Sequence, residues 1–343
     1  MKTIACILVE QGKPVVVDEV EMPSLAFGQV LVRIKATGIC GKQLDEHIGT
    51  RGHDPYLPHL MGHEAAGVVE GVGEGVTRVK IGDHVVASWM KGSGINAPTP
   101  TYLWNGKKIN AGNITTFQRH SIISENRLSS IPHDIPFDDA ALLGCAIPTG
   151  MGIVINQAKA GPGDTLAVFG AGGIGLSAIN AASLVSAGMI IAIDMVEEKL
   201  QMAKRFGATH VINAQKTDPV EAIKQLTKGA GVDFSICTIG KAKPMEQAYD
   251  SAHQSKGSVI LAAVPGEKIC LDPYPMNSGR KISGSHGGDT VIDRDIPKYV
   301  SLYQAGKIKT KDLISNRFKI EEINNIFESL KKGEISGRAI IEF

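Results

Sequence analysis

The stretch DTLAVFGAGGIG, residues 164–175, is the part of this 343-residue sequence that decides the fold. The short apolar run LAVF ends directly in glycines, and an apolar, helix-like segment, LSAINAASLV, follows. This order predicts a strand, a tight glycine turn and a helix. Such a turn lets the backbone approach a pyrophosphate closely at the helix N-terminus. The candidate cofactor-binding residues of the turn are Gly170, Gly172, Gly173, Ile174 and Gly175.

Asp194 ends the next predicted strand, IIAID, about 20 residues after the glycine turn. A carboxylate there can accept hydrogen bonds from both hydroxyls of an adenosine ribose, and it would repel a 2′-phosphate. We therefore predict that the cofactor is NAD rather than NADP. A glycine turn followed by a merely solvated aspartate is the weaker interpretation, because the motif has the strand and helix context that dinucleotide binding requires.

The rest of the chain divides around this motif. Residues 164–286 alternate short apolar strands with amphipathic helices, which is typical of a parallel, doubly wound Rossmann sheet. Residues 1 to about 145 carry short alternating runs between turn signals, which predict antiparallel strands. The tail predicts two helices and a closing strand, AIIEF, that returns to the first domain. We predict an α/β protein with a Rossmann domain over 148–287 and a mainly β domain made of 1–147 and 288–343.

Composition excludes several classes of function. Hydrophobic residues make up 43% of the chain, charged residues 21%, and the formal net charge is +1, so nothing favours nucleic acid or an acidic membrane surface as a partner. No apolar run reaches the roughly 20 residues that span a bilayer, and the N-terminus does not resemble a signal peptide. Five scattered cysteines do not form a disulfide pattern. We expect a cytoplasmic protein with reduced thiols.

Two cysteines and a histidine are candidate metal ligands. Cys40 ends a predicted strand in ATGIC, His63 lies beside Glu64 in LMGHE, and Cys145 lies in ALLGC. Two thiolates and one imidazole leave the fourth position of a tetrahedral zinc site open, as in catalytic rather than structural sites. The spacing alone leaves other roles open, because a buried cysteine often serves only packing and a histidine among glycines is often a loop residue.

GHEAAGVVEGVGEGV, residues 62–76, resembles the zinc-binding signature of the medium-chain alcohol dehydrogenases. The segments GIC, GDHV, ALLGC followed by TG, GAGGIG and GRAII occur in the family's order over nearly the whole chain. The resemblance implies a GroES-like fold for the mainly β domain. It also implies reversible hydride transfer between NAD and a small-molecule alcohol, with an aldehyde or ketone as the product.

The resemblance further implies roles for single residues. Cys40, His63 and Cys145 would bind one catalytic zinc, with Glu64 beside it, orienting or transiently replacing a ligand. A cysteine at 145, rather than a glutamate, resembles the alcohol-dehydrogenase branch more than the polyol-dehydrogenase branch. The family's usual homo-oligomers imply a homodimer or homotetramer. Around the nucleotide, the resemblance implies Thr149 at the nicotinamide, Lys199 at the adenosine ribose and Arg338 at the pyrophosphate.

The lobe after GDHV departs from the family. Many relatives hold a second, structural zinc there with four closely spaced cysteines, but residues 87–120 of this chain contain no cysteine. We therefore expect no structural zinc. The lobe would instead be held by packing of Trp89, Tyr102 and Trp104, although these aromatic residues could also wall the substrate entrance.

The residues after Cys40 also depart from the family, which usually has a hydroxyl two residues on, passing the proton outward, and an aspartate three residues on, supporting the histidine ligand. This chain has Lys42 and Gln43, a shift of about two positive charges if Lys42 stays protonated. We hypothesise that Lys42 exchanges the proton or holds an acidic or hydroxyl-rich substrate. The alternative is a solvated lysine that points away from the zinc. Arg51, His53 and Asp54 could line the same polar pocket, and the equal alternative is that they lie on an exposed loop.

These departures favour a polar, sugar-derived or acidic secondary alcohol as the substrate. Two other functions have to be weighed. A zinc-free quinone or enone reductase of the same superfamily would lack the cysteine and histidine ligands that this chain has. A non-catalytic nucleotide-binding or structural protein would not need both the ligand set and the nucleotide loop.

Overall fold

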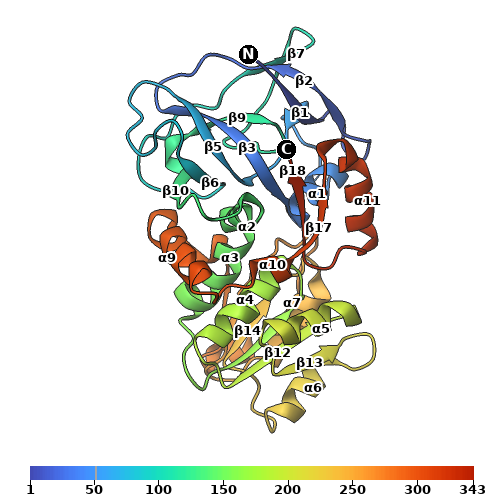
Figure 1. The fold of residues 1–343 in the computed structure, drawn as a ribbon. Helices are drawn as coiled ribbons and strands as arrows, with labels where there is room; N and C mark the ends of the chain where they lie inside the picture. The colour runs from blue at the N-terminus through green and yellow to red at the C-terminus, as the bar shows by residue number, and fades with distance from the viewer. Residues whose placement is uncertain (51) are drawn as a thin grey trace. The chain divides into compact units, whose positions relative to one another are not determined.

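The computed structural model describes residues 1–50 and 52–343, which form two compact units. The first unit contains residues 1–145, 291–306 and 310–343, and the second contains residues 146–290 and 307–309. Figure 1 follows the chain from blue at the N-terminus to red at the C-terminus. Compactness does not show what a unit binds, so the assignment of residues 1–147 and 288–343 to zinc and of 148–287 to NAD stays a prediction.

One sheet of the first unit is antiparallel and has five strands in the order β4-β1-β2-β7-β8. Strand β1 is buried along most of its length, whereas β2 is mostly exposed or half-buried. The bounds of these strands are β1 (Lys2–Leu8), β2 (Val16–Glu21), β4 (His59–Leu60), β7 (Tyr102–Trp104) and β8 (Lys107–Ile109).

A second sheet of this unit has the order β10-β6-β5-β3-β18-β17, and β9 pairs with β3. The predicted closing strand is β18, which pairs antiparallel with β3 and parallel with β17, so the C-terminal end of the chain completes this sheet. The bounds are β3 (Gln29–Ile39), β5 (Glu64–Val72), β6 (His84–Ser88), β9 (His120–Ser124), β10 (Leu128–Ile131), β17 (Ile314–Phe318) and β18 (Arg338–Glu342).

Helices cover parts of these sheets. Helix α11 buries Ile323, Ile326 and Phe327, at the i, i+3, i+4 spacing of one helix face, in a core with Cys6 and Leu8 of β1. The α-helices of this unit are α1 (Gly41–Ile48), α2 (Phe137–Ala141), α9 (Ile292–Gln304), α10 (Thr310–Leu313) and α11 (Ile323–Lys332). The 3-10 turns are η1 (Glu125–Arg127), η2 (Leu142–Gly144) and η5 (Ile320–Glu322).

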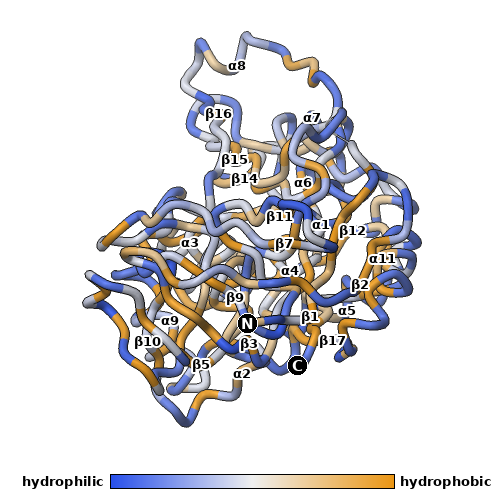
Figure 2. The backbone as a smooth tube through the Cα atoms, turned by 90° about the horizontal axis from the view of Figure 1, so that it is seen from above, coloured by the Kyte–Doolittle hydropathy of each residue, from blue (hydrophilic) through white to orange (hydrophobic). Residues whose placement is uncertain are grey.

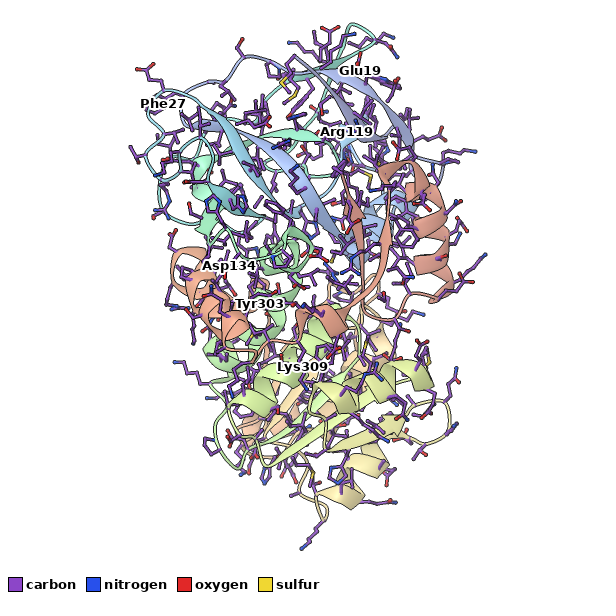
Figure 3. The ribbon with its side chains drawn as sticks, viewed as in Figure 1. Glu19, Phe27, Arg119, Asp134, Tyr303 and Lys309 are labelled. Atoms are coloured by element: carbon purple, nitrogen blue, oxygen red, sulfur yellow. The ribbon has the colours of Figure 1, made fainter. Side chains whose placement is uncertain are left out.

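Helix α9 is tied to the first unit by polar contacts. The hydroxyl of Tyr303, marked in Figure 3, donates a hydrogen bond to the buried carboxylate of Asp139 at 2.6 Å. One residue further on, Gln304 donates to Asp134, also marked in Figure 3, at 3.4 Å. These contacts explain why residues 291–306 belong to this unit although they follow the residues of the other one.

The lobe after β6 is packed onto the five-stranded sheet. Tyr102 is fully buried, and its hydroxyl accepts hydrogen bonds from the backbone N–H of Ile122 at 3.0 Å and from Gln118 at 3.2 Å. Trp104 packs against the same core, and its indole N–H donates to Asp18 of β2 at 2.8 Å. Tyr102 and Trp104 therefore serve packing, whereas Trp89 contributes a backbone carbonyl that accepts a hydrogen bond from Arg127.

The second unit contains a parallel six-stranded sheet in the order β13-β12-β11-β14-β15-β16. The chain starts in the middle at β11, proceeds to one edge and then returns to β14 and proceeds to the other, so the topology reverses between β11 and β14. This arrangement confirms the predicted doubly wound sheet. The strand bounds are β11 (Thr165–Phe169), β12 (Met189–Asp194), β13 (His210–Asn213), β14 (Phe234–Cys237), β15 (Ser258–Leu261) and β16 (Lys281–Gly284).

The central strands β11, β12 and β14 are buried along most of their length, whereas the edge strand β16 is mostly exposed. Hydrophobic residues recur along the central strands in Figure 2, for example in β12. The helices that connect or flank them are α3 (Ala146–Gly152), α4 (Gly173–Leu184), α5 (Glu197–Phe206), α6 (Pro219–Leu226), α7 (Ala242–Ser251) and α8 (Tyr274–Asn277). Two further short elements are the π-helix η3 (Ile153–Ala158) and the 3-10 turn η4 (Gly287–Asp289).

No single helix of the described residues has the length and apolarity needed to cross a membrane. The bent pair of segments 137–144 and 146–158 meets the criterion only when its two parts are counted together.

Candidate metal centre and nucleotide loop

The three predicted metal ligands come from three separate segments of the first unit. Cys40 follows β3 and caps the N-terminus of α1, and Cys145 directly follows η2. His63 lies just before β5, after Gly62, whose φ of +93° is the left-handed conformation that glycine adopts readily. A side chain at Gly62 would also collide with Thr116 and Phe117, because an added Cβ would lie 2.5–2.7 Å from their atoms.

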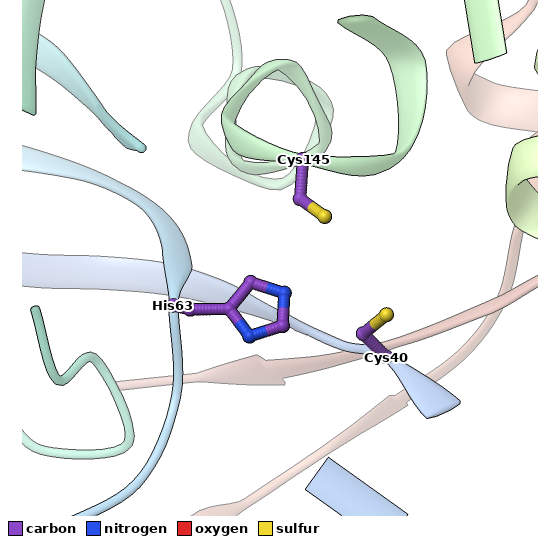
Figure 4. Close-up of side chains that lie close together, drawn as sticks. All are labelled: Cys40, His63 and Cys145. Atoms are coloured by element: carbon purple, nitrogen blue, oxygen red, sulfur yellow. The ribbon is translucent and has the colours of Figure 1, made fainter. Parts of the chain in front are cut away.

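The structure brings these three side chains together. Their ligand atoms all lie within 4.8 Å of one another, and Figure 4 shows both sulfurs and one ring nitrogen facing a common point. Both cysteines are buried and His63 is half-buried. A tetrahedral zinc with bonds of about 2.0–2.3 Å holds its ligand atoms roughly 3.3–3.8 Å apart, so this donor set fits zinc with small adjustments.

The surroundings favour the thiolate form of Cys40. The pKa of its thiol lies well below the usual range because the side chain of Cys145 hydrogen-bonds to it, and Arg338 and His63 add to the effect against the opposing effect of burial. Only the thiolate is a good metal ligand. The local electrostatics are therefore already suited to a cation.

Gln43 supports the histidine from the side away from the sulfurs. This residue is 1% exposed, its side-chain oxygen accepts a hydrogen bond from the Cys40 backbone N–H at 2.8 Å, and its amide nitrogen contacts Nδ1 of His63. The sequence interpretation noted only that a carboxylate was missing here. The spacing Cys-x-x-Gln at a helix start is that of a capping box, which indicates the hydrogen bond to the Cys40 backbone but not the contact with His63.

Glu64 points into the first unit, where its carboxylate forms a buried ion pair with the guanidinium of Arg338. Glycines make room for it on two sides: an added Cβ at Gly38 would lie 2.5 Å from its Oε1, and one at Gly144 would lie 2.9 Å from its Cβ. Among the described residues, the metal-ligand cluster consists of Cys40, His63 and Cys145, without Glu64. Its role at the zinc, and that of Arg338 at the pyrophosphate, stay predictions.

Lys42 lies on the first turn of α1, and its ammonium forms an ion pair with Glu46 one turn further on, at 3.1 Å. The two side chains are 37% and 28% exposed, so the lysine charge is in part compensated and in part solvated. Asp54 pairs with His59 at 3.2 Å and caps the backbone of Tyr56. His53 is exposed, and Arg51 lies outside the described residues.

The nucleotide loop is built within the second unit as predicted. Gly170 directly follows β11 with a φ of +96°, and an added Cβ at Gly175 would lie 1.8 Å from the carbonyl oxygen of Gly170. At Gly172 an added Cβ would meet no atom within 4 Å, so the space in front of the α4 N-terminus is open. This is the cradle that a pyrophosphate requires.

Asp194 ends β12 beside this loop. One carboxylate oxygen accepts a hydrogen bond from the backbone N–H of Ala171 at 2.8 Å, and the other accepts from Met195 at 2.8 Å. Thr149, on α3, is buried, and its hydroxyl has no hydrogen-bond partner among the described residues. Lys199 lies on the first turn of α5. The positions of Asp194 and the glycines fit a dinucleotide, while the roles of Thr149 and Lys199 stay predictions.

Comparisons with known proteins find two matching families and several similar relatives. Residues 26–133 match the family described as "Alcohol dehydrogenase GroES-like domain", and residues 173–305 match the one described as "Zinc-binding dehydrogenase". The chain is 34% identical to an alcohol dehydrogenase class-3 of Cereibacter sphaeroides, over 100% of both proteins. It is also 34% identical to an S-(hydroxymethyl)glutathione dehydrogenase of Paracoccus denitrificans, over 97% of this chain and 98% of that protein.

Among solved structures, the benzyl alcohol dehydrogenase from Acinetobacter calcoaceticus is similar to this chain with a TM-score of 0.91. Its sequence is 30% identical, and the match covers 100% of this chain and 99% of that one. A 2R,3R-butanediol dehydrogenase from Bacillus subtilis is similar with a TM-score of 0.81 and 26% identity, over 99% of both chains.

Proposed function

This chain belongs to the zinc-dependent medium-chain alcohol dehydrogenase family, and from that premise we propose that Cys40, His63 and Cys145 hold its catalytic zinc. The family confirms the predicted enzyme class, an NAD-dependent alcohol dehydrogenase, and the predicted cofactors, zinc and NAD. The matches do not support the zinc-free reductase or the non-catalytic protein. Which residues hold the cofactors, and which alcohol reacts, belong to the proposal.

The observation that carries the proposal is the convergence of two sulfurs and one imidazole within 4.8 Å. A zinc ion held there supplies a Lewis acid that lowers the pKa of an alcohol hydroxyl, and NAD supplies the hydride acceptor. The chain itself contributes to the charge balance of the site. The lowered pKa of Cys40 keeps its sulfur available as a ligand, and the buried pair of Glu64 and Arg338 adds no net charge beside the metal.

The nucleotide loop would orient NAD. The backbone at the N-terminus of α4 would bind the pyrophosphate, and the carboxylate of Asp194 would accept hydrogen bonds from the ribose. The remaining proposed cofactor contacts are Thr149, Lys199 and Arg338. We further propose that residues 1–147 and 288–343 form the unit that binds zinc. Residues 148–287 would form the unit that binds NAD. The lobe without cysteines would bind no structural zinc, so the enzyme would contain one zinc per chain.

For the substrate, we propose a polar, sugar-derived or acidic secondary alcohol. The support is the set of polar and charged side chains that follows Cys40: the pair of Lys42 and Glu46 on α1, and Asp54, which contacts His59 at the start of β4. A second candidate comes from relatives that are named S-(hydroxymethyl)glutathione dehydrogenase. That compound also carries a hydroxyl and carboxylates, so the two candidates share their polar character, although its hydroxyl is on a primary carbon.

The experiment is a screen of alcohols, polyols, hydroxy acids and S-(hydroxymethyl)glutathione with NAD, following the reduced nicotinamide. Zinc-loaded enzyme should reduce NAD with at least one of them, and enzyme dialysed against a chelator should not until zinc is restored. Metal analysis should give one zinc per chain. Turnover that survives complete removal of zinc would refute the proposed site.

We also propose a cytoplasmic homodimer or homotetramer. Support for the compartment comes from the five free cysteines, four of which are buried in the structure. Sedimentation of the purified enzyme would give the oligomeric state.

A further inference from the structure

Gln43 is the side chain that joins two of the proposed zinc ligands. It occupies the third position of α1, is 1% exposed, and contacts both the Cys40 backbone and the His63 ring. The family resemblance places an aspartate at this point of the chain. A carboxylate has two oxygens that both accept hydrogen bonds, whereas a primary amide has one acceptor oxygen and one donor nitrogen. The two groups therefore cannot serve the same pair of neighbours.

The Cys40 backbone fixes which way the amide points. A backbone N–H can only donate, so the group that faces it at 2.8 Å must be the side-chain oxygen of Gln43. The NH₂ group is then left facing Nδ1 of His63. Because that amide nitrogen is a donor, Nδ1 has to be the acceptor, and a neutral His63 ring carries its single proton on Nε2.

The ring nitrogen that remains for a metal is Nε2. Figure 4 shows one nitrogen of the His63 ring facing the sulfurs of Cys40 and Cys145, and Nδ1 is the one in contact with Gln43. A metal on Nε2 requires a neutral ring to carry its proton on Nδ1 instead. The ring has one proton in both states, so its charge is unchanged, but Nδ1 turns from an acceptor into a donor and meets the donor nitrogen of Gln43.

We propose that Gln43 is a positioning residue that limits how tightly the catalytic zinc is held. Without metal, its amide holds His63 in the tautomer protonated on Nε2. With metal, the amide has to turn over so that its oxygen accepts from Nδ1, which leaves its NH₂ group facing the Cys40 N–H. Without metal both hydrogen bonds of Gln43 are made, whereas with metal one can be made only at the expense of the other, and a carboxylate would accept both. This inference rests on the proposed zinc site.

The tautomer can be observed in the unmodified enzyme. Nitrogen NMR of histidine-labelled protein, with His63→Gln to assign the signal, distinguishes a protonated from an unprotonated Nδ1. We expect Nδ1 to be unprotonated in the zinc-free enzyme and protonated after one equivalent of zinc, with a change in the side-chain NH₂ signals of Gln43. A proton on Nδ1 in both states would overturn the proposal.

Zinc affinity gives the second test, by competition with a chromophoric chelator. Gln43→Glu should tighten zinc binding by about 10- to 100-fold, the range by which such supporting groups change metal affinity. The matched control is Lys42→Gln, which lowers the charge beside Cys40 by the same one unit but offers nothing to His63. It should tighten binding less than Gln43→Glu does. Equal effects would mean that charge alone is responsible, and no effect of Gln43→Glu in a folded protein would also overturn the proposal.

The same titration separates this inference from the proposed function. Cys145→Ser should weaken zinc binding strongly if the site is assigned correctly. If Cys145→Ser has no effect on zinc, the proposed function fails. If Cys145→Ser loses zinc while Gln43→Glu matches the parent enzyme, only the role of Gln43 fails.

Discussion

The metal centre and the nucleotide loop are assembled from the sequence in opposite ways. The loop is continuous, since residues 164–175 supply the strand, the turn and the helix start, and Asp194 follows one strand later. The proposed metal centre would take its ligands from positions 40, 63 and 145, and the buried ion pair beside it joins Glu64 to Arg338, which lies far along the chain. A short motif therefore specifies the backbone of one site, while the other depends on the whole first unit being folded.

The comparison implies that replacing one ligand side chain should abolish the proposed metal centre. In Cys145→Ser, a poor ligand replaces a thiolate, and we expect kcat/KM with the best alcohol to fall by about a thousandfold or more, given the several kcal/mol that a Lewis acid contributes. Metal analysis should show that zinc is lost in parallel. Cys270→Ser is the control, because this cysteine is exposed and lies in the second unit, and it should keep full activity and zinc.

Substitutions of Gly175 and Gly172 in the nucleotide loop should have different effects. Gly175→Ala places a Cβ against the Gly170 carbonyl and should lower the free energy of unfolding by about 1–3 kcal/mol, as overpacking does. Gly172→Ala adds its Cβ to open space, so stability should stay within about 0.5 kcal/mol. NAD affinity of Gly172→Ala should nevertheless fall, because the pyrophosphate needs that space. Calorimetry and NAD titration measure the two effects, and unchanged NAD affinity would mean that the loop is only a turn.

Asp194→Asn tests the charge at the end of β12. The amide oxygen can accept either from Ala171 or from Met195, but not from both, because the NH₂ group of asparagine only donates, so the loop should lose one hydrogen bond. In addition, NADP should no longer be repelled. We expect the preference for NAD over NADP, as a ratio of kcat/KM values, to fall by roughly tenfold to a hundredfold, the equivalent of one charge-assisted hydrogen bond. A preference that stays the same would place the discrimination on other residues.

The smallest effect concerns Lys42. Because its charge is shared with Glu46 and partly solvated, Lys42→Ala should raise KM for an acidic or hydroxyl-rich substrate by only about threefold to tenfold, in line with the modest energies of exposed ion pairs. KM for an uncharged alcohol of similar size, such as benzyl alcohol, should change less. Identical kinetics with both substrates would show that Lys42 is a solvated side chain without a role in the site.

The contrast between a continuous loop and a centre built from distant residues also explains what could be predicted from the sequence. The glycine loop and Asp194 were predictable because their spacing reflects local backbone geometry, and β18 was expected as the returning strand. The convergence of Cys40, His63 and Cys145 came from the family resemblance, since spacing alone did not require it. The pairing of Glu64 with Arg338 could not be foreseen, because it depends on the register of β18 against β3.

Gln43 shows a different limit of sequence reasoning. Comparing residue types at one position indicated a lost carboxylate, but the contact depends on where the first turn of α1 places the side chain. The capping spacing Cys-x-x-Gln indicates only the hydrogen bond to the Cys40 backbone.

The position of β18 also has a consequence for the order in which the protein is made. The second unit is complete, apart from residues 307–309, once residue 290 has left the ribosome. The first unit cannot close its seven-stranded sheet, or pair Glu64 with Arg338, until the last few residues emerge. During synthesis Glu64 is therefore made long before Arg338, so the first unit, which is begun first, is completed last.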